Sequence, residues 1–281
     1  LIVVLGATGG QGGSIVDAFL KLPNWRVRGL TRNTSSEKAK ALATRGVEVV
    51  RADTDDQASL ESAFQGANVI FAFTDYYDFF FELGPEKSMA RELEQGSNLA
   101  RAAAKIPTLE RYVWSTLPNT AFITQGKAIV PHFQGKANVD LFIKDDLPHL
   151  YKKTTFTIFT IFAANLTLYE IFRPIYLVTN SAKKWIQFYP AHPETPYPSI
   201  GNHRVNSGIF VKAVVENPPP TGTYVLCNVE DLTLCSFLAA WGRASGISPQ
   251  PNSTAVVQIS LEQYVALWGE MGEEQASQWR F

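Results

Sequence analysis

The opening stretch, residues 1–32, constrains the fold most, because an apolar run leads directly into closely spaced glycines. Residues 1–5 are all apolar and include two valines and an isoleucine, which is typical of a strand buried on both faces of a parallel sheet. In the spacing that follows, Gly6 permits a sharp turn, Gly9 lets a phosphate approach the backbone, and Gly12 allows a helix to pack closely. An amphipathic helical pattern comes next. The stretch therefore predicts a strand–turn–helix unit that binds a diphosphate group.

Arg32, just after the second predicted strand (residues 25–30), indicates which dinucleotide is bound. An acidic side chain at this position would accept hydrogen bonds from a free ribose 2′-hydroxyl. Arg32 instead offers a planar cation suited to a 2′-phosphate, although an exposed loop arginine would look the same in sequence. The sequence thus favours NADP(H) over NAD(H) as the cofactor.

Further cofactor ligands are predicted at the same ends of the predicted strands. Asp53 follows the third strand and is placed near the adenine amino group, while Asp55 or Asp56 is as well explained as a helix N-cap. The remaining predicted ligands lie in the glycine-rich turn or at the end of the fourth strand: Thr8, Gly10, Gln11 and Thr74.

Strand and helix patterns alternate over residues 1–160, which predicts an α/β fold with a doubly wound parallel sheet of the Rossmann type. Beyond this region, prolines and aromatic residues interrupt the alternation. We expect an NADP-binding domain over 1–162 and a smaller C-terminal α/β lobe for substrate over 163–281, with some segments returning to the Rossmann sheet. The elements expected in the second part are helices at 205–215, 234–245 and 261–271 and a strand at 224–227.

Aromatic residues crowd positions 76–81, directly after the fourth predicted strand. Ligands bind at such strand ends, so Tyr76, Tyr77 and Phe80 are predicted to contact substrate, and Asn165 is placed with them. Packing within the fold explains the aromatic residues equally well.

Composition excludes several classes of function. The 281-residue chain has a formal net charge of −1 and no basic stripe, which argues against nucleic-acid binding. The longest apolar stretch, 156–168, is too short and too polar to span a membrane. Two cysteines and four scattered histidines match no metal site. We expect a cytoplasmic monomer or homodimer that takes a small-molecule substrate.

Several motifs together resemble the NmrA-like family of atypical short-chain dehydrogenases/reductases, of the kind found in fungi. They are Val-Leu-Gly-Ala-Thr-Gly-Gly-Gln-Gly at 4–12, Leu-Thr-Arg at 30–32, Val-Trp-Ser at 113–115, Val-Pro-His-Phe-Gln-Gly-Lys at 130–136 and Gly-Glu-Met-Gly-Glu-Glu at 269–274. The resemblance implies an NADP-binding Rossmann domain with a small C-terminal lobe. It leaves the activity open, since the family includes both reductases and cofactor-sensing regulators.

The resemblance also points to the residues that would carry a reaction. Ordinary short-chain dehydrogenases place a proton-donating tyrosine four residues before a lysine, whereas this chain has His132 before Lys136. One helical turn puts both side chains on one face. Lys136 would bind the nicotinamide ribose, His132 would exchange a proton near neutral pH, and Ser115 would polarise the reacting group. A helix-terminal surface position is the alternative for His132.

These expectations combine into one leading function and two alternatives. The leading prediction is an NADP(H)-dependent oxidoreductase of secondary metabolism that acts on a medium-sized, partly aromatic metabolite. The first alternative is an NADP(H)-sensing regulator without turnover that acts on a protein partner. The second is a biosynthetic enzyme that uses bound NADP+ to oxidise an amine and assist cyclisation, for which Asp75, Asp78 and Glu82 would suit a cationic substrate.

Overall fold

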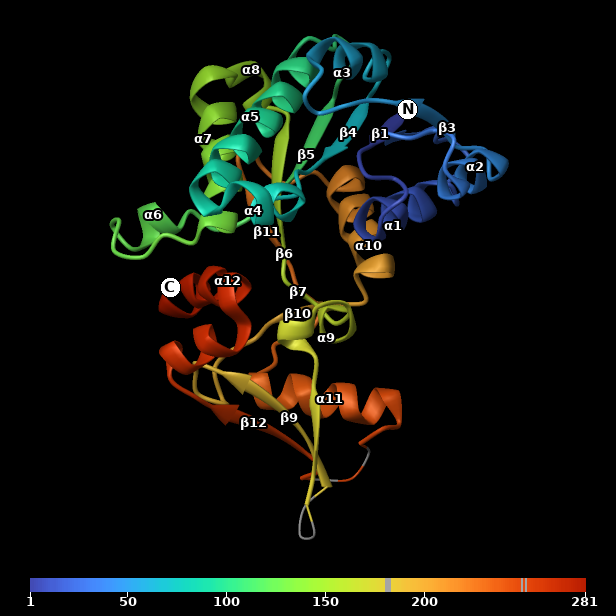
Figure 1. The fold of residues 1–281 in the computed structure, drawn as a ribbon. Coiled ribbons are helices and arrows are strands. Elements are labelled where there is room, and N and C mark those ends of the chain that lie inside the picture. The colour runs from blue at the N-terminus through green and yellow to red at the C-terminus, as the bar shows by residue number, and fades with distance from the viewer. Residues whose placement is uncertain (180–182, 249, 251) are drawn as a thin grey trace. The chain divides into compact units, whose positions relative to one another are not determined.

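The computed structural model describes residues 1–179, 183–248, 250 and 252–281 (Figure 1). The chain divides into two compact units that interleave along the sequence. The first, here called the Rossmann unit, comprises Leu1–Gln125, Pro131–Phe159 and His203–Cys227. The second unit comprises Gly126–Val130, Thr160–Asn202 and Asn228–Phe281.

Seven parallel strands form the central sheet of the Rossmann unit, in the order β11-β6-β5-β4-β1-β2-β3. They are β1 (Ile2–Val4), β2 (Val27–Thr31), β3 (Glu48–Arg51), β4 (Val69–Ala72), β5 (Arg111–Thr116), β6 (Thr154–Phe159) and β11 (Tyr224–Cys227). The strand order reverses at β1, which lies between β4 and β2. Ligands bind beside the carboxyl ends of the strands at such a reversal. The doubly wound sheet predicted from the sequence is confirmed.

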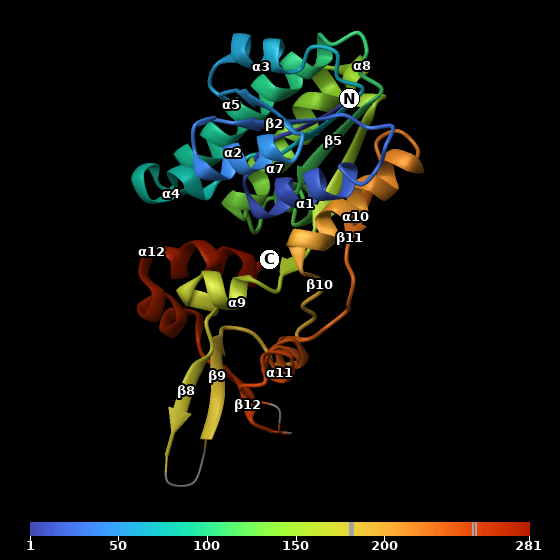
Figure 2. The same cartoon turned by 90° about the vertical axis from the view of Figure 1, so that its right-hand side faces the viewer.

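Helices cover both faces of this sheet (Figure 2). On one face α1 (Gly10–Phe19) packs against α10 (His203–Glu216). On the other face lie α3 (Gln57–Ala63), α5 (Pro85–Ala104), α7 (Pro131–Asp146) and α8 (Pro148–Tyr151). The shorter helices of the unit are α2 (Glu37–Thr44), α4 (Tyr77–Leu83) and α6 (Thr120–Ile123).

The core between the sheet and α3, α5 and α7 is closely packed. Tyr112 and Trp114 of β5 are fully buried there, as is Val139 of α7. A Cβ atom added to Gly96 of α5 would lie 2.4 Å from Cγ2 of Val139. Because no larger residue than glycine fits at this crossing, α7 is held close to α5, and this contact fixes the helix that carries Lys136.

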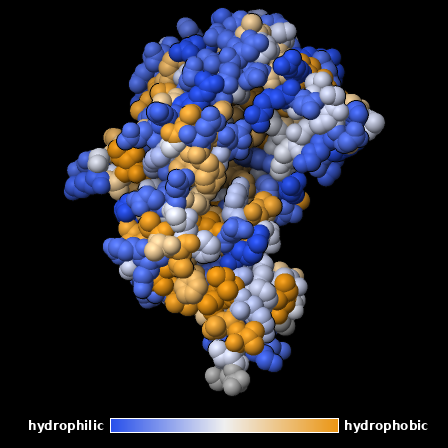
Figure 3. Space-filling model, in the orientation of Figure 1, coloured by the Kyte–Doolittle hydropathy of each residue, from blue (hydrophilic) through white to orange (hydrophobic). Residues whose placement is uncertain are grey.

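The second unit contains two small sheets and its own core. The strands are β7 (Ile161–Phe162) paired with β10 (Ser199–Gly201), and β8 (Ile175–Val178), β9 (Lys183–Tyr189) and β12 (Thr254–Gln258) in one three-stranded sheet. The helices are α9 (Asn165–Leu168), a 3₁₀ turn η1 (Glu170–Phe172), α11 (Leu234–Ser245) and α12 (Leu261–Arg280). The four side chains of β8 are between 41% and 59% exposed, and hydrophobic surface is visible on this unit (Figure 3).

Most elements lie where the sequence predicts them. The aromatic stretch after β4, for which no helix or strand was predicted, forms the helix α4. The last helix was expected to end at residue 271, whereas α12 continues to Arg280 through a break at Gly269, where φ is 57°. Glycine adopts this left-handed conformation without strain, so the helix changes direction and resumes. Among the described residues, no helix combines the length and apolar character required to cross a membrane.

Candidate cofactor and active site

The glycine-rich turn joins β1 to α1 in the geometry that a bound diphosphate requires. Gly6 has φ +56°, and its carbonyl oxygen accepts a hydrogen bond of 2.8 Å from the backbone nitrogen of Gly9. A Cβ atom on Gly12 would lie 2.4 Å from the carbonyl oxygens of Leu5 and Gly6, so only glycine permits this packing. No side chain caps α1 within the described part of the chain. Its first N–H groups are therefore oriented to receive an anion, and the turn fits a diphosphate.

Helix α10 packs against the same turn through a residue that the sequence analysis missed. A Cβ atom on Gly10 would lie 2.2 Å from Nε2 of His203. The two helices are held together at Ser14, whose hydroxyl donates to the carbonyl oxygen of Val205 and accepts from the backbone nitrogen of Gly208. Burial, and then the charge of Arg204, lower the pKa of His203. Nothing local in the sequence connects His203 with the turn, because only the tertiary fold brings them together.

Arg32 lies directly after β2 with its guanidinium exposed. Its Nη1 is 3.2 Å from Oδ2 of Asp78 on α4, and the two side chains are 71% and 39% exposed. An ion pair this exposed contributes little to stability, on the order of 0–1 kcal/mol. The ion pair with Asp78 alone would therefore not prevent another anion from binding Arg32.

Asp53 lies in the turn between β3 and α3, where it organises the backbone. Its Oδ1 accepts a hydrogen bond from the nitrogen of Asp55, and its own nitrogen donates to Oγ of Ser59. Asp56 is the N-cap of α3, which confirms the capping alternative for that residue.

Lys136 is enclosed by acceptors at the carboxyl end of β4. Its Nζ donates to Oε1 of Glu92 at 2.5 Å, to the carbonyl oxygen of Thr74 at 2.6 Å and to Oγ1 of Thr74 at 3.1 Å. The Glu92 side chain is 1% exposed and the Lys136 side chain 12%. An ammonium group has three N–H donors, so these protein atoms engage all of them.

Glu92 was not singled out from the sequence, although it is the most deeply buried charged group beside the predicted site. It lies on the inward face of α5, one turn after the buried Ser88. A Cβ atom on Gly135 would lie 2.5 Å from Oε2 of Glu92. The glycine immediately before Lys136 therefore makes room for the carboxylate against α7.

Ser115 and Gln11 meet at the carboxyl end of β5. Nε2 of Gln11 donates a hydrogen bond of 3.1 Å to Oγ of Ser115, which is 8% exposed. The start of α1 is thereby linked to a strand end two places from β1 in the sheet.

His132 is buried, so the surface alternative for this residue is wrong. It is 7% exposed and packs among aromatic rings, with its centroid 5.9 Å from that of Tyr76 and 5.7 Å from that of Tyr77. Tyr76 and Phe80 are themselves only 2% and 4% exposed. The aromatic stretch therefore has a packing role, whatever further contacts Tyr77 makes.

Asp140, one turn after Lys136 on α7, is a second buried carboxylate that the sequence analysis missed. It accepts hydrogen bonds from Nε1 of Trp114 at 2.9 Å, Oγ1 of Thr116 at 2.8 Å and the hydroxyl of Tyr224 at 3.1 Å. Burial raises its pKa to about 7, and these three hydrogen bonds oppose the rise. The residue ties α7 to both β5 and β11.

The other predicted site residues lie elsewhere. Thr8 is partly buried in the glycine-rich turn, and Asn165 begins α9 in the second unit. Among the residues that the structure describes, no three His, Cys, Asp or Glu side chains gather as a metal site would require.

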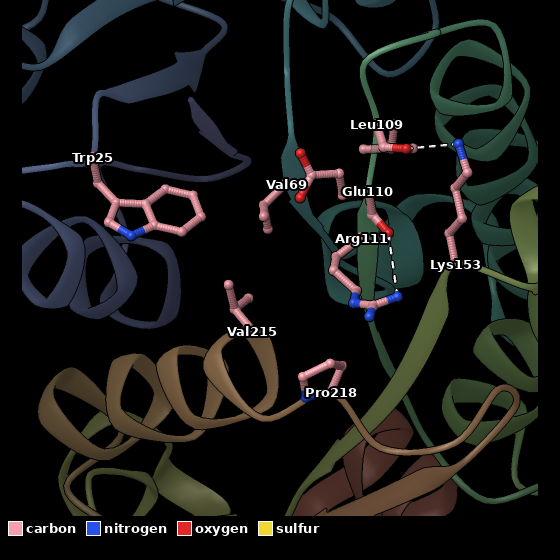
Figure 4. Close-up of a pocket in the computed structure, with 8 residues that line it drawn as sticks. All are labelled: Trp25, Val69, Leu109, Glu110, Arg111, Lys153, Val215 and Pro218. Carbon is pink, nitrogen blue, oxygen red and sulfur yellow. Dashed lines mark hydrogen bonds between the residues drawn. The ribbon is translucent and has the colours of Figure 1, made fainter.

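A cavity of about 480 Å³ lies at the amino ends of the strands, whereas the glycine-rich turn lies at their carboxyl ends (Figure 4). Val69 and Arg111, the first residues of β4 and β5, line it together with Trp25, Leu109, Glu110, Lys153, Val215 and Pro218. Nζ of Lys153 is already bonded to the carbonyl oxygen of Leu109 at 2.6 Å. Because ligands of doubly wound sheets bind at the carboxyl ends of the strands, this cavity is not the candidate site.

A known protein family matches most of the chain. The model of the NmrA-like family matches residues 1–266. The chain belongs to the NmrA-like family. The match confirms the resemblance drawn from the sequence motifs.

Relatives of this NmrA-like chain include fungal proteins named as oxidoreductases. NmrA-like family domain-containing oxidoreductase cpsB of Aspergillus campestris (strain IBT 28561) is 32% identical over 142 residues, 50% of this chain and 40% of the relative. Oxidoreductase hkm9 of Aspergillus hancockii is 33% identical over 147 residues, 52% of this chain and 42% of the relative. The matched region thus spans well under two thirds of either relative.

Solved structures share the fold at low sequence identity. The structure of NmrA, described as a negative transcriptional regulator, superposes with a TM-score of 0.73 at 20% identity over 92% of this chain and 74% of NmrA. The triphenylmethane reductase of Citrobacter sp. in complex with NADP(H) gives 0.72 at 18% identity over 99% of this chain and 88% of the reductase.

Proposed function

We propose that this NmrA-like chain is an NADP(H)-dependent oxidoreductase that acts on a medium-sized, partly aromatic metabolite. The observation that carries the proposal is the meeting of three features at the carboxyl edge of one sheet. These are the uncapped glycine-rich turn after β1, Arg32 after β2, and the polar groups Ser115 and Lys136 near the ends of β5 and β4. This edge is where doubly wound sheets bind dinucleotides.

Each group has a distinct task in this proposal. The backbone N–H groups at the start of α1 bind the diphosphate, and Arg32 binds the 2′-phosphate. The ammonium of Lys136 lies at the end of β4, beside the strand-order reversal, where it orients the nicotinamide half. Ser115, held by Gln11, offers a hydroxyl to the reacting group. The nicotinamide cofactor supplies or accepts the hydride.

The relatives support chemistry rather than binding alone, since those named above are called oxidoreductases. The burial of His132 among aromatic rings is compatible with a closed, apolar surrounding for a transferred hydride. An amine-oxidising activity that assists cyclisation falls within the same proposal, with NADP+ as the oxidant.

A second candidate, an NADP(H) sensor without turnover, is favoured by two specific observations. All three donors of Lys136 are engaged by the protein, and position 132 carries no phenolic acid. The fold of NmrA, described as a transcriptional regulator, is compatible with such a role.

A screen for turnover tests the two candidates. NADPH oxidation and NADP+ reduction are followed with fractionated metabolite extracts, alongside binding titrations of NADP+, NADPH, NAD+ and NADH. The oxidoreductase proposal predicts at least one fraction that supports turnover. Binding of NADP+ and NADPH with different affinities, together with no turnover in any fraction, would favour the sensor.

A further inference from the structure

We propose that Glu92 is a positioning residue that acts through Lys136 and holds its ammonium at the carboxyl end of β4. This inference rests on the proposed NADP(H) site, because Lys136 is the group that meets the nicotinamide half there. The inference assigns a role to a residue of α5 that no motif identifies.

The burial of Glu92 is the first argument. A carboxylate that is 1% exposed has lost almost all of its hydration, and such a charge persists in a protein only with a counter-charge and hydrogen bonds. Lys136 provides the counter-charge at 2.5 Å. The two residues lie on different helices, α5 and α7, so the pair sets where the ammonium lies relative to the sheet.

The hydrogen-bond directions around Thr74 give the second argument. The ionised carboxylate of Glu92 only accepts, so the single hydroxyl proton of Thr74 is donated to Oε1 at 2.8 Å. The lone pairs of the same hydroxyl then accept from Nζ of Lys136. Glu92, Thr74 and Lys136 thus form a closed triangle of hydrogen bonds. In it the Thr74 hydroxyl donates to Glu92 and accepts from Lys136, and Lys136 also donates to Glu92.

Space around Gly135 gives the third argument. A Cβ atom on any larger residue at 135 would lie 2.5 Å from Oε2 of Glu92, closer than two such atoms approach. Glycine at this position therefore lets the carboxylate lie against α7 with its Oε1 on Lys136.

The triangle also determines which contact a ribose hydroxyl would replace. The bond from Lys136 to the Thr74 hydroxyl, at 3.1 Å, is the longest of the three and joins the ammonium to a neutral group. The bond to Glu92 is shorter and charge-assisted, hence stronger. When the cofactor binds, Lys136 therefore exchanges its bond to the Thr74 hydroxyl and keeps Glu92.

A double-mutant cycle on cofactor binding tests the inference. NADPH fluorescence titrations compare wild type, Glu92→Gln, Lys136→Met and the double variant, and thermal unfolding is followed in parallel. We expect Glu92→Gln to weaken NADPH binding about tenfold, within the usual coupling of contacting residues. Lys136→Met should weaken binding at least as much, and the double variant no more than Lys136→Met alone. Glu94→Gln, on the exposed side of the same helix, is the matched control and should bind like wild type.

The other possible results of these titrations would contradict either the role of Glu92 or the proposed function. Wild-type affinity in Glu92→Gln, with or without a lower unfolding temperature, would leave Glu92 as a structural ion-pair partner and overturn the inference alone. Additive losses in the double variant would mean that Glu92 does not act through Lys136. No NADPH binding by the wild type would overturn the proposed function as well. Should Glu92→Gln not fold, the comparison of Lys136→Met with the double variant still tests the inference, because weaker NADPH binding by the double variant than by Lys136→Met would overturn it.

Discussion

The indole nitrogen of Trp114 donates a hydrogen bond of 2.9 Å to the carboxyl group of Asp140, and neither side chain reaches solvent to any extent. Trp114 lies in the centre of β5 and Asp140 one turn beyond Lys136 on α7. The contact therefore fixes α7 against the sheet at the point where the candidate active site is built. It also places an ionisable group in surroundings that favour its neutral form.

This burial predicts a pH dependence of stability. The pKa of Asp140 is raised to about 7 in the folded protein, mainly by burial, against about 3.9 for an unfolded aspartate. Between these values the folded state binds more protons than the unfolded state, so the contribution of Asp140 to the free energy of unfolding decreases as pH rises from about 4 to about 7. Each pKa unit is worth about 1.4 kcal/mol. Urea denaturation at several pH values should show this decrease in wild type and a smaller one in Asp140→Asn.

The control for this effect is Asp145→Asn, an exposed position on the same helix. It should leave the pH dependence as in wild type. Identical slopes for wild type and Asp140→Asn would show that Asp140 is ionised in the folded protein throughout this range.

Cofactor choice is predicted to depend on Arg32. Arg32→Ala should weaken NADP(H) binding by about 1.5–3 kcal/mol, the range for a hydrogen bond to a charged group, and leave NAD(H) binding nearly unchanged. Asp78→Asn should strengthen NADP(H) binding slightly, because the ion pair of 3.2 Å no longer competes with the phosphate. Titration with all four cofactors measures both effects. Equal losses of affinity for NADP(H) and NAD(H) in Arg32→Ala would show that Arg32 does not bind the 2′-phosphate.

Two residues of helix α4 test whether its aromatic side chains pack in the core or contact a substrate. Phe80 is 4% exposed, whereas its neighbour Phe81 is 66% exposed. Phe80→Ala should lower the free energy of unfolding by about 3–5 kcal/mol, the usual cost of truncating a buried phenylalanine, and Phe81→Ala should change it little. Chemical denaturation of both variants decides. Little change in Phe80→Ala would indicate that its ring faces a ligand site rather than the core.

The parts of the site that were predictable from the sequence are those encoded by adjacent residues. The glycine-rich turn, Arg32 at a strand end and the capping role of Asp56 each depend on short-range chain geometry. The local strand–helix alternation predicted the doubly wound sheet for the same reason.

The buried carboxylates could not be found in this way. In sequence, Glu92 and Asp140 look like polar residues of two amphipathic helices. Their roles depend on Thr74, Trp114 and Tyr224, which come from other elements and meet them only in the folded chain. The burial of His132 could not be decided for a related reason, because Tyr76 and Tyr77, which cover it, come from a distant part of the chain.

The last prediction separates enzyme from sensor and takes the buried ion pair into account. Lys136→Met alone leaves the Glu92 carboxylate buried without its counter-charge, which typically costs about 3–5 kcal/mol of stability. The double variant Glu92→Gln/Lys136→Met removes both charges and should recover much of that loss in chemical denaturation. If chemical denaturation shows the double variant to be folded, its turnover reports on the missing ammonium rather than on unfolding. For an enzyme we expect turnover to fall by about 10²-fold or more relative to wild type, the scale of lost acid–base assistance.

If turnover in a metabolite fraction persists at the wild-type rate in this variant, Lys136 has no part in the chemistry. If no fraction supports turnover in the wild type while NADP+ and NADPH protect it differently from proteolysis, the oxidoreductase proposal gives way to the sensor.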